Sequence, residues 1–173
     1  MIHLPNRSAL SRWPLIFGGL LIVALFALNA LANSTVWKLQ WPKTDFSKQS
    51  IDLGEIMSGG PPKDGISAID KPEFITVAHM VKAKNLADGE PVVGVEINRE
   101  AKAYPLRFLI WHEIVNDEVG GMPVTVIYRT LCNSATVFEQ RLDVRVFDFG
   151  TTGNLRKSDL VIYDRQTESW WQQ

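Results

Sequence analysis

The stretch PVTVIY at residues 123–128 decides the fold class. It is rich in β-branched side chains, which favour an extended strand. Gly120 and Gly121 stand just before it and indicate a tight turn. Similar short apolar stretches downstream predict further strands at 136–139, 144–149 and 160–163. GTTGN at 150–154 is predicted to be the loop between the last two.

A second strand pattern lies upstream in PVVGVEI, residues 91–97. Val93, Val95 and Ile97 alternate with other residues and therefore share one face. The turn at 98–100 leads back into a second short stretch, so residues 92–104 are predicted to form a β-hairpin.

One helix is predicted, at residues 105–115. Pro105 suits the first position of a helix, and the residue before a proline prefers an extended backbone. An apolar stripe follows at Leu106, Leu109, Ile110 and Ile114. Because Phe108 and Trp111 lie on other faces, the helix is expected to be buried nearly all round.

These patterns predict a β-rich α+β protein: an antiparallel barrel- or sandwich-like domain with one or two short helices. The spacing of β–α–β units, which would favour a parallel sheet, is missing. SGGPPKDG at 58–65 reads as a rigid surface loop that opens the folded domain. The expected organisation is an export segment at 1–32, a tether at 33–57 and the β-rich domain at 58–173.

Composition limits the possible functions. The 173 residues contain 18 Lys and Arg against 19 Asp and Glu, a net charge of −1, and this balance argues against a nucleic-acid-binding protein. The single cysteine rules out an internal disulfide framework and any multi-cysteine metal site. The nucleotide-binding motifs GxxxxGK and GxGxxG are absent, as are HExxH and GxSxG.

The N-terminal 32 residues have the features of an export signal. Arg7 and Arg12 precede the apolar run 13–28, and Ala30 and Ala32 then form the A-x-A pattern of a signal-peptidase site. The apolar run is shorter than the roughly 20 residues that span a membrane comfortably, although counting through Ala32 reaches that length. A buried core helix is the structural interpretation of this apolar run. As an export signal, the segment is expected to be a cleaved signal peptide, with an uncleaved anchor as the alternative.

Both alternatives predict the same location for the rest of the chain. The arginines stay inside, so the remaining residues are expected to lie outside the cytoplasm, in the periplasm, the cell envelope or the medium. The expected membrane contact is through residues 13–32 if the segment is uncleaved. No nucleic-acid or nucleotide partner is expected.

Several strings resemble a bacterial and archaeal family known as domain of unknown function 3179. The shared strings are SGGPPKDGI (58–66), PVVGVEIN (91–98), AKAYPLR (101–107), WHEIVND (111–117), LCNSA (131–135) and SDLVIYDRQTESWWQ (158–172). The resemblance implies an exported or membrane-tethered domain with no assigned activity. Family members usually continue past the equivalent of Gln172, which implies a C-terminally shortened chain here. The terminal Trp170 and Trp171 are expected either to fold back into a core or to reflect that shortening.

The sequence departs from the family near its cysteine. The family pattern resembles YCPLCN, whereas this chain has Tyr128, Arg129 and Thr130 before Leu131-Cys132-Asn133. The first cysteine of the C-x-x-C pair has become Arg129. A single chain with one cysteine therefore cannot carry out dithiol redox chemistry or bind a metal through two thiolates.

Cys132 and His112 are the leading candidates for chemistry. As a thiolate, Cys132 would be a nucleophile or metal ligand, with Arg129 as a nearby cation and His112 as imidazole partner. Asn116 or Asn133 would then orient the histidine. Weak copper or zinc binding by Cys132 and His112 is the metal alternative, and a buried, inert cysteine is the structural one.

Two further groups are candidates for chemistry or for structural ion pairs. Glu113 falls on the apolar stripe, so its carboxylate is predicted to pair with Arg107 or Arg129, or to have a raised pKa that suits a general base. Asp164 and Arg165 lie in an expected turn and are predicted to pair with each other.

Overall fold

The computed structural model describes residues 36–83, 87 and 89–173. The chain divides into two units, residues 1–42 and 43–173. In the described part of the first unit, residues 36–40 are helical and the backbone N–H of Trp41 donates to the carbonyl of Trp37. The predicted export segment at 1–32 lies outside the described residues. Among the described residues, we find no helix with the length and apolar character needed to cross a membrane.

The second unit is organised around a four-stranded sheet. Its order is β2-β5-β6-β7, with β2 (Ile69–Asp70), β5 (Ile114–Val119), β6 (Met122–Arg129) and β7 (Ser134–Glu139). Only the short β2 runs parallel to its neighbour; the other pairs are antiparallel. Gly120 and Gly121 join β5 to β6 with φ of 57° and 77°, so the two-residue turn needs the left-handed backbone that glycine adopts freely.

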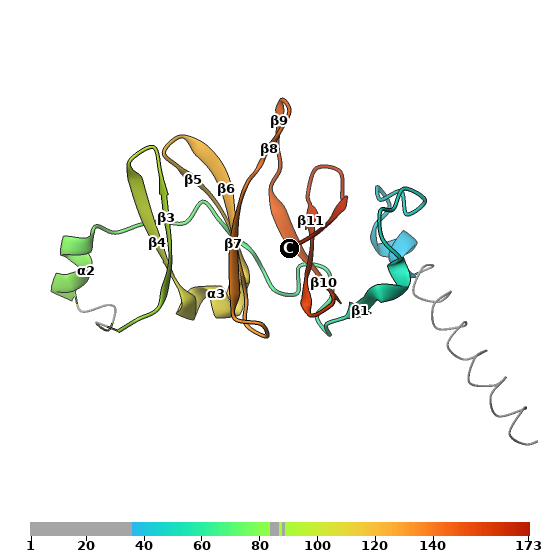
Figure 1. Cartoon of the computed structure of the whole chain (residues 1–173), viewed down its shortest axis with the longest axis horizontal. Coiled ribbons are helices and arrows are strands. Elements are labelled where there is room, and N and C mark those ends of the chain that lie inside the picture. Colours follow the sequence, from blue (N-terminus) through green and yellow to red (C-terminus); the bar gives the residue numbers. More distant parts are fainter. Residues whose placement is uncertain (1–35, 84–86, 88) are drawn as a thin grey trace, which may run out of the picture. The chain divides into compact units, whose positions relative to one another are not determined.

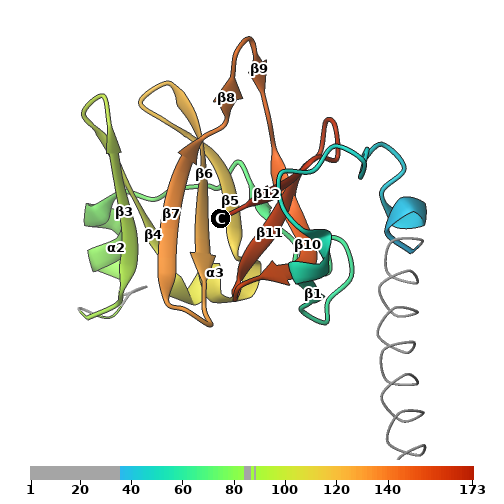
Figure 2. The same cartoon turned by 45° about the vertical axis from the view of Figure 1, so that its right-hand side comes forward.

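One face of this sheet packs against a second antiparallel sheet. The second sheet has the order β1-β10-β11-β12, formed by β1 (Ile56–Ser58), β10 (Phe149–Arg156), β11 (Asp159–Asp164) and β12 (Trp170–Gln172). The core between the two sheets contains Ile114 and Ile127 from the first and Phe149, Leu160 and Ile162 from the second. Figures 1 and 2 show β10 and β11 on one side of the β5–β6–β7 layer.

The other face of the central sheet is covered by a hairpin and a helix. The hairpin is β3 (Val92–Ile97) with β4 (Glu100–Pro105), which confirms the predicted hairpin, and α3 (Leu106–His112) follows directly. Their core joins Val95, Tyr104 and Leu109 to the valines of β5 and β6. Alternation along β5 and β6 thus gives each of the two cores its own set of side chains.

The remaining elements lie outside these layers. They are η1 (Leu53–Glu55), α2 (Val77–Ala83) and a small hairpin of β8 (Arg141–Leu142) and β9 (Arg145–Val146). A β-rich fold with few helices and antiparallel sheets is therefore confirmed. Among the described residues, none of the sheets closes into a barrel.

Helix α3 differs from its prediction. It ends at His112 rather than 115, and Leu109 is its only buried residue. Phe108, Ile110 and Trp111 are 52%, 48% and 77% exposed, so the expectation of burial nearly all round was wrong. The physical reason is that the short helix packs one side on the sheet, and no other described segment covers its remaining apolar faces.

The predicted loop GTTGN at 150–154 was also wrong, because these residues lie within β10. The strand carries an irregularity between Thr151 and Asn154, where its register with β11 shifts. At Gly150 an added Cβ would come within 2.7 Å of the Tyr163 ring. Gly153 has φ of 74° and closely approaches the carbonyl of Pro61. The glycines therefore serve a bulge and close packing rather than a turn.

A single buried amide joins five segments at the centre of the unit. The Asn116 Nδ2 donates to Asp70 Oδ1 and to the Phe149 carbonyl, both at 2.8 Å. Its Oδ1 accepts from Thr125 Oγ1 at 3.0 Å, Gln140 Nε2 at 2.7 Å and the Phe149 N–H at 3.0 Å. Asn116 is 4% exposed, so these bonds replace water in the core.

We expect Asn116→Ala to lower the free energy of unfolding by about 3 kcal/mol or more, since each buried partner left unsatisfied costs roughly 1–3 kcal/mol. Asn98→Ala is the matched control, because Asn98 makes one exposed hydrogen bond, to the Gly120 carbonyl. Urea denaturation of both variants measures the difference. Equal losses would contradict the central role of Asn116.

Candidate functional site

Most of the sequence-predicted site residues lie at one end of the central sheet. Helix α3 ends there, and the turn between β6 and β7, residues 130–133, lies at the same end (Figures 1 and 2). The backbone joins the two directly, because the Tyr128 N–H donates to the Glu113 carbonyl at 2.9 Å. The fold therefore places the WHE and LCN strings in one region.

Glu113 forms a buried ion pair with Arg129. It caps α3 with a positive φ of 58°, and its N–H donates to the Leu109 carbonyl at 2.8 Å. Arg129 Nη1 donates to Glu113 Oε1 at 2.7 Å, and the two residues are 8% and 4% exposed. Arg129 is thus the partner, whereas Arg107 pairs with Glu90 at 3.1 Å. Burial raises the pKa of the Glu113 carboxyl above its usual value, and the Arg129 guanidinium opposes that rise.

Two buried polar atoms near this pair lack hydrogen-bond partners among the described residues: Arg129 Nε and Gln173 Oε1. Both residues are neighbours of Ser134. Ser134 lies opposite Arg129 in the β6–β7 pairing, and its Oγ accepts from Gln173 Nε2 at 3.4 Å. One atom is a donor and the other an acceptor. A water molecule or a polar group of a ligand is what such atoms bind.

Cys132 and His112 are hydrogen-bonded to different segments. Cys132 is exposed, with its Sγ 3.0 Å from Ser134 Oγ and donating to Asp159 Oδ1 at 3.4 Å. His112 Nδ1 lies 2.8 Å from the Ser67 carbonyl. The described residues contain no group of three His, Cys, Asp or Glu side chains that could hold a metal ion. The charged side chain that contacts the thiol is the Asp159 carboxylate, while Arg129 is engaged by Glu113.

The two asparagines suggested as orienting groups contact neither Cys132 nor His112 through any described hydrogen bond. Asn116 is the buried amide between the sheets described above. Asn133 adopts a positive φ of 50°, and its Oδ1 accepts from the Tyr128 hydroxyl at 2.8 Å. Asn116 thus holds the two sheets together, and Asn133 stabilises the β6–β7 turn.

The predicted pair between Asp164 and Arg165 does not form. Asp164 is fully buried and accepts from the Thr167 N–H at 2.6 Å and from Trp171 Nε1 at 3.0 Å. Arg165 instead pairs with Asp70 at 2.8 Å. Asp164 therefore stabilises the turn before β12, whereas Arg165 links β2 to the second sheet.

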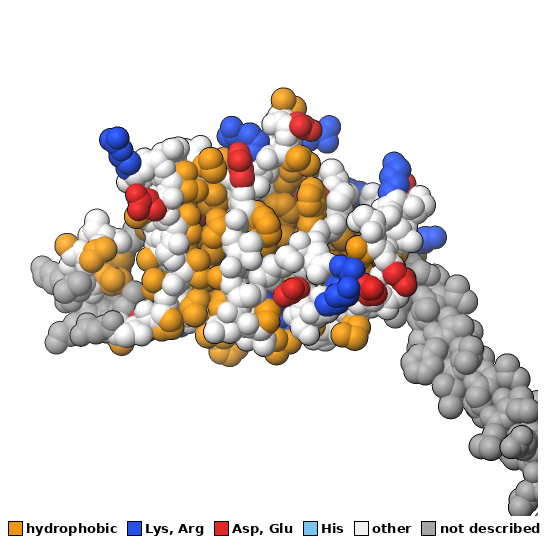
Figure 3. Space-filling view, viewed as in Figure 1, with side chains coloured by type: hydrophobic (Ala, Val, Ile, Leu, Met, Phe, Trp, Pro, Cys, Tyr) orange, Lys and Arg blue, Asp and Glu red, His pale blue; other side chains and the backbone are white. Residues whose placement is uncertain are grey.

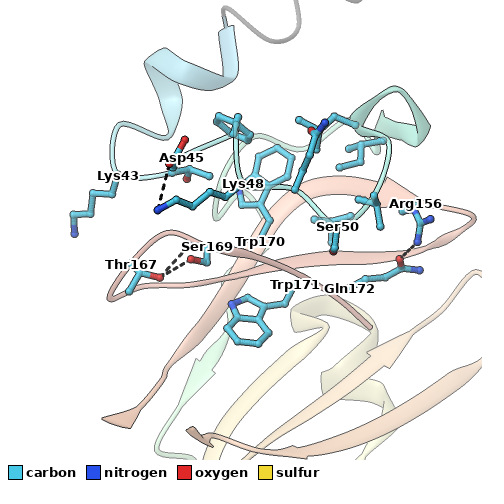
Figure 4. Close-up of a pocket in the computed structure, with 17 residues that line it drawn as sticks. Lys43, Asp45, Lys48, Ser50, Arg156, Thr167, Ser169, Trp170, Trp171 and Gln172 are labelled. Carbon is cyan, nitrogen blue, oxygen red and sulfur yellow. Dashed lines mark hydrogen bonds and ion pairs between the residues drawn. The ribbon is translucent and has the colours of Figure 1, made fainter. Parts of the chain in front are cut away.

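A cavity that sequence reasoning missed lies between residues 43–56 and the β11–β12 hairpin (Figure 4). Its volume is about 360 Å³. Trp170 forms one wall and meets the Phe46 ring edge-on at 5.1 Å. The Lys48 ammonium at this cavity pairs with Asp45 at 3.6 Å, and Arg156 pairs with Glu55 at 2.6 Å. No sequence motif links these two distant segments.

A wider groove, about 1910 Å³, lies beside the β3–β4 hairpin. Phe74 and Tyr104 meet edge-on within it at 5.5 Å, and Lys102 Nζ lies 4.6 Å above the Phe74 ring. The Tyr104 hydroxyl donates to Asp117 at 2.8 Å. Burial, together with the Asp117 carboxylate, raises the pKa of Tyr104 above its ordinary value.

A comparison with known protein families gives one match. The family model described as "Protein of unknown function (DUF3179)" matches residues 63–173. The comparisons with curated proteins and with solved structures found no match.

We expect Arg129→Met to lower the free energy of unfolding near neutral pH by about 3–5 kcal/mol, because it leaves a buried carboxylate unpaired. Without the cation, the pKa of Glu113 rises further. The folded state then retains a proton that the unfolded chain releases, so the variant becomes more stable as pH falls from the raised pKa towards the ordinary carboxyl value. Urea denaturation at about pH 7 and about pH 5 measures both effects.

Arg107→Met is the matched control, because the Arg107–Glu90 pair is more exposed and such a pair is worth about 0–1 kcal/mol. A pH-independent loss in Arg129→Met, or the same loss in both variants, would contradict the assigned role of the buried pair.

Proposed function

Since the chain belongs to the DUF3179 family of proteins of unknown function, with residues 63–173 matched, we propose that it acts as an extracytoplasmic domain. The observation that carries the proposal is the order of Arg7, Arg12, the apolar run 13–28 and Ala30-Leu31-Ala32 ahead of the β-rich region. In this proposal, residues 1–32 deliver the domain to the periplasm or cell envelope. If they are not cleaved, residues 13–32 hold it at the membrane.

We expect the mature chain to begin at Asn33 when the full chain is expressed in a bacterial host, because signal peptidase cleaves after the small residue Ala32. Intact mass and N-terminal sequencing of envelope fractions measure this. Ala32→Leu is the matched variant and is expected to retain residues 1–32. Unprocessed wild-type chain in the membrane fraction would support the anchor instead, and soluble cytoplasmic chain would contradict both.

A second candidate function concerns the thiol. The exposed Cys132, polar contacts from Ser134 and Asp159, and His112 at the same end of the sheet favour an envelope metal-binding or thiol module. A thiol-dependent enzyme using Cys132, His112 and Glu113 is the further alternative. Two good metal ligands bind far more weakly than a closed four-ligand site. Copper and zinc suit thiolate and imidazole, and they are the metals to test.

We expect the wild-type chain to bind Cu(I) and Zn(II) weakly, and a second thiol at position 129 to strengthen that binding or to form a disulfide with Cys132. Arg129→Cys is combined with Glu113→Gln, so that no buried carboxylate is left unpaired. Arg129→Ser with Glu113→Gln is the matched control, and Cys132→Ala removes the remaining thiol. Metal titration monitored by calorimetry measures the affinities. Equal, negligible binding by every variant would exclude the metal site.

A further inference from the structure

The outer edge of β7 carries unpaired backbone groups. β7 is the last strand of its sheet, and among the described residues its only strand partner is β6. The Gln140 N–H donates to the Pro123 carbonyl at 2.9 Å. This bond identifies which residues of β7 direct their backbone groups towards β6. Hydrogen-bonded pairs recur every second residue, so the backbone N–H and C=O groups of Ala135, Val137 and Glu139 point away from β6.

This edge lacks the usual features that prevent strand pairing. Ser134–Phe138 contains no charge, proline or glycine. Val137 and Phe138 are 37% and 39% exposed. The one charged residue of β7 is Glu139 at its C-terminal end, whereas β3 carries Glu96 within the strand and β4 carries both Glu100 and Lys102. Figure 3 shows hydrophobic side chains gathered beside β7 and below the β8–β9 hairpin.

We propose that β7 pairs antiparallel with β7 of a second copy of this chain, so that two four-stranded sheets become one sheet of eight strands across a two-fold axis. Of the registers that the outward-facing groups of Ala135, Val137 and Glu139 allow, those centred on Val137 and on Thr136 pair the most residues of the strand. A two-fold axis perpendicular to the sheet keeps each face of the joined sheet continuous.

The side chains suit both registers. Centred on Val137, the pairing sets Phe138 opposite Thr136 and Glu139 opposite Ala135 of the second copy. Centred on Thr136, it sets Phe138 opposite Ser134. The two Glu139 carboxylates therefore never lie opposite each other, and the aromatic ring faces a small hydroxyl side chain that leaves room for it.

Exposed apolar residues flanking β7 also become complementary. The β6–β7 turn has Leu131 71% exposed, and the β8–β9 hairpin that follows β7 has Leu142 52% exposed. In an antiparallel pair, the hairpin of one copy approaches the β6–β7 turn of the other. The proposed contact thus covers apolar surface beyond the strand itself, and it is this self-complementarity that favours a second copy over an unrelated partner.

Cysteine cross-linking in the full chain tests the pairing. In a Cys132→Ser background, either Thr136→Cys or Val137→Cys is expected to give a disulfide-linked dimer in envelope fractions, depending on which residue lies at the axis. Val92→Cys is the matched control on β3, where the side chain is 44% exposed. A dimer band at twice the chain mass, at least tenfold stronger than in the control, is the expected result.

Substitutions at Val137 provide the second readout. Val137→Pro removes an outward N–H and leaves the β6–β7 ladder intact, and Val137→Lys places like charges near the axis. If Thr136 lies at the axis, both are expected to reduce the Thr136→Cys dimer at least tenfold. If Val137 lies at the axis, Ala135→Pro, which also removes an outward N–H, is expected to reduce the Val137→Cys dimer to the same extent. Val92→Lys is expected to leave either dimer unchanged. Unchanged thermal melting of Val137→Lys shows that the loss does not come from unfolding.

Three results would overturn the proposal. They are cross-linking no stronger than in the Val92→Cys control, a dimer that survives the proline substitution that removes an outward N–H, and adducts with a different protein in place of the dimer. The last result would assign the edge to an unrelated extended segment.

Discussion

The side-chain amide of Asn116 is the interaction on which the arrangement of the layers depends. A core amide is stabilising only if its donors and acceptor are all satisfied. Asn116 lies on β5, and its partners come from β2, β6, β10 and the residue after β7. The backbone N–H and carbonyl of Phe149 both bond to it, so the start of β10 is held in one register against β5. Apolar packing alone would tolerate sliding between the two sheets, whereas these directional bonds do not.

That fixed register positions the end of the molecule where the candidate residues lie. Because β5 starts at Ile114, the residue before it must end the helix and reverse the chain, and Glu113 does so with a positive φ. The same residue buries its carboxylate, which Arg129 neutralises from β6. The Arg129 guanidinium is thus engaged inside the protein by the Glu113 carboxylate. The thiol of Cys132 is left with polar neighbours of its own.

The two edge strands of the central sheet, β2 and β7, differ in how they are bound to the rest of the chain. At β2, the Asp70 carboxylate accepts from Asn116 and from Arg165, which ties that edge to the second sheet. At β7, no charged side chain precedes Glu139, and the apolar residues of the strand remain partly exposed. An edge that is bound to its own chain has no free hydrogen-bonding groups to offer, whereas an uncharged open edge offers a template for another strand.

Elements whose signals are local could be predicted from the amino-acid sequence alone. The β-branched run at 123–128, the 92–104 hairpin and the Gly120-Gly121 turn all follow from side-chain alternation and backbone preferences within a few residues. The shared strings, among them WHEIVND and LCNSA, likewise identified the family.

Features that depend on distant segments could be recognised only in the folded structure. GTTGN looked like a loop, but its glycines make room for Tyr163 and Pro61, which lie far away in the sequence. The apolar stripe of α3 gave no information on how many of its faces would find partners. The choice of Arg129 over Arg107 for Glu113, and the separate partners of Cys132 and His112, follow from strand register and sheet packing. Such contacts arise from long-range geometry, which no local pattern of residues encodes.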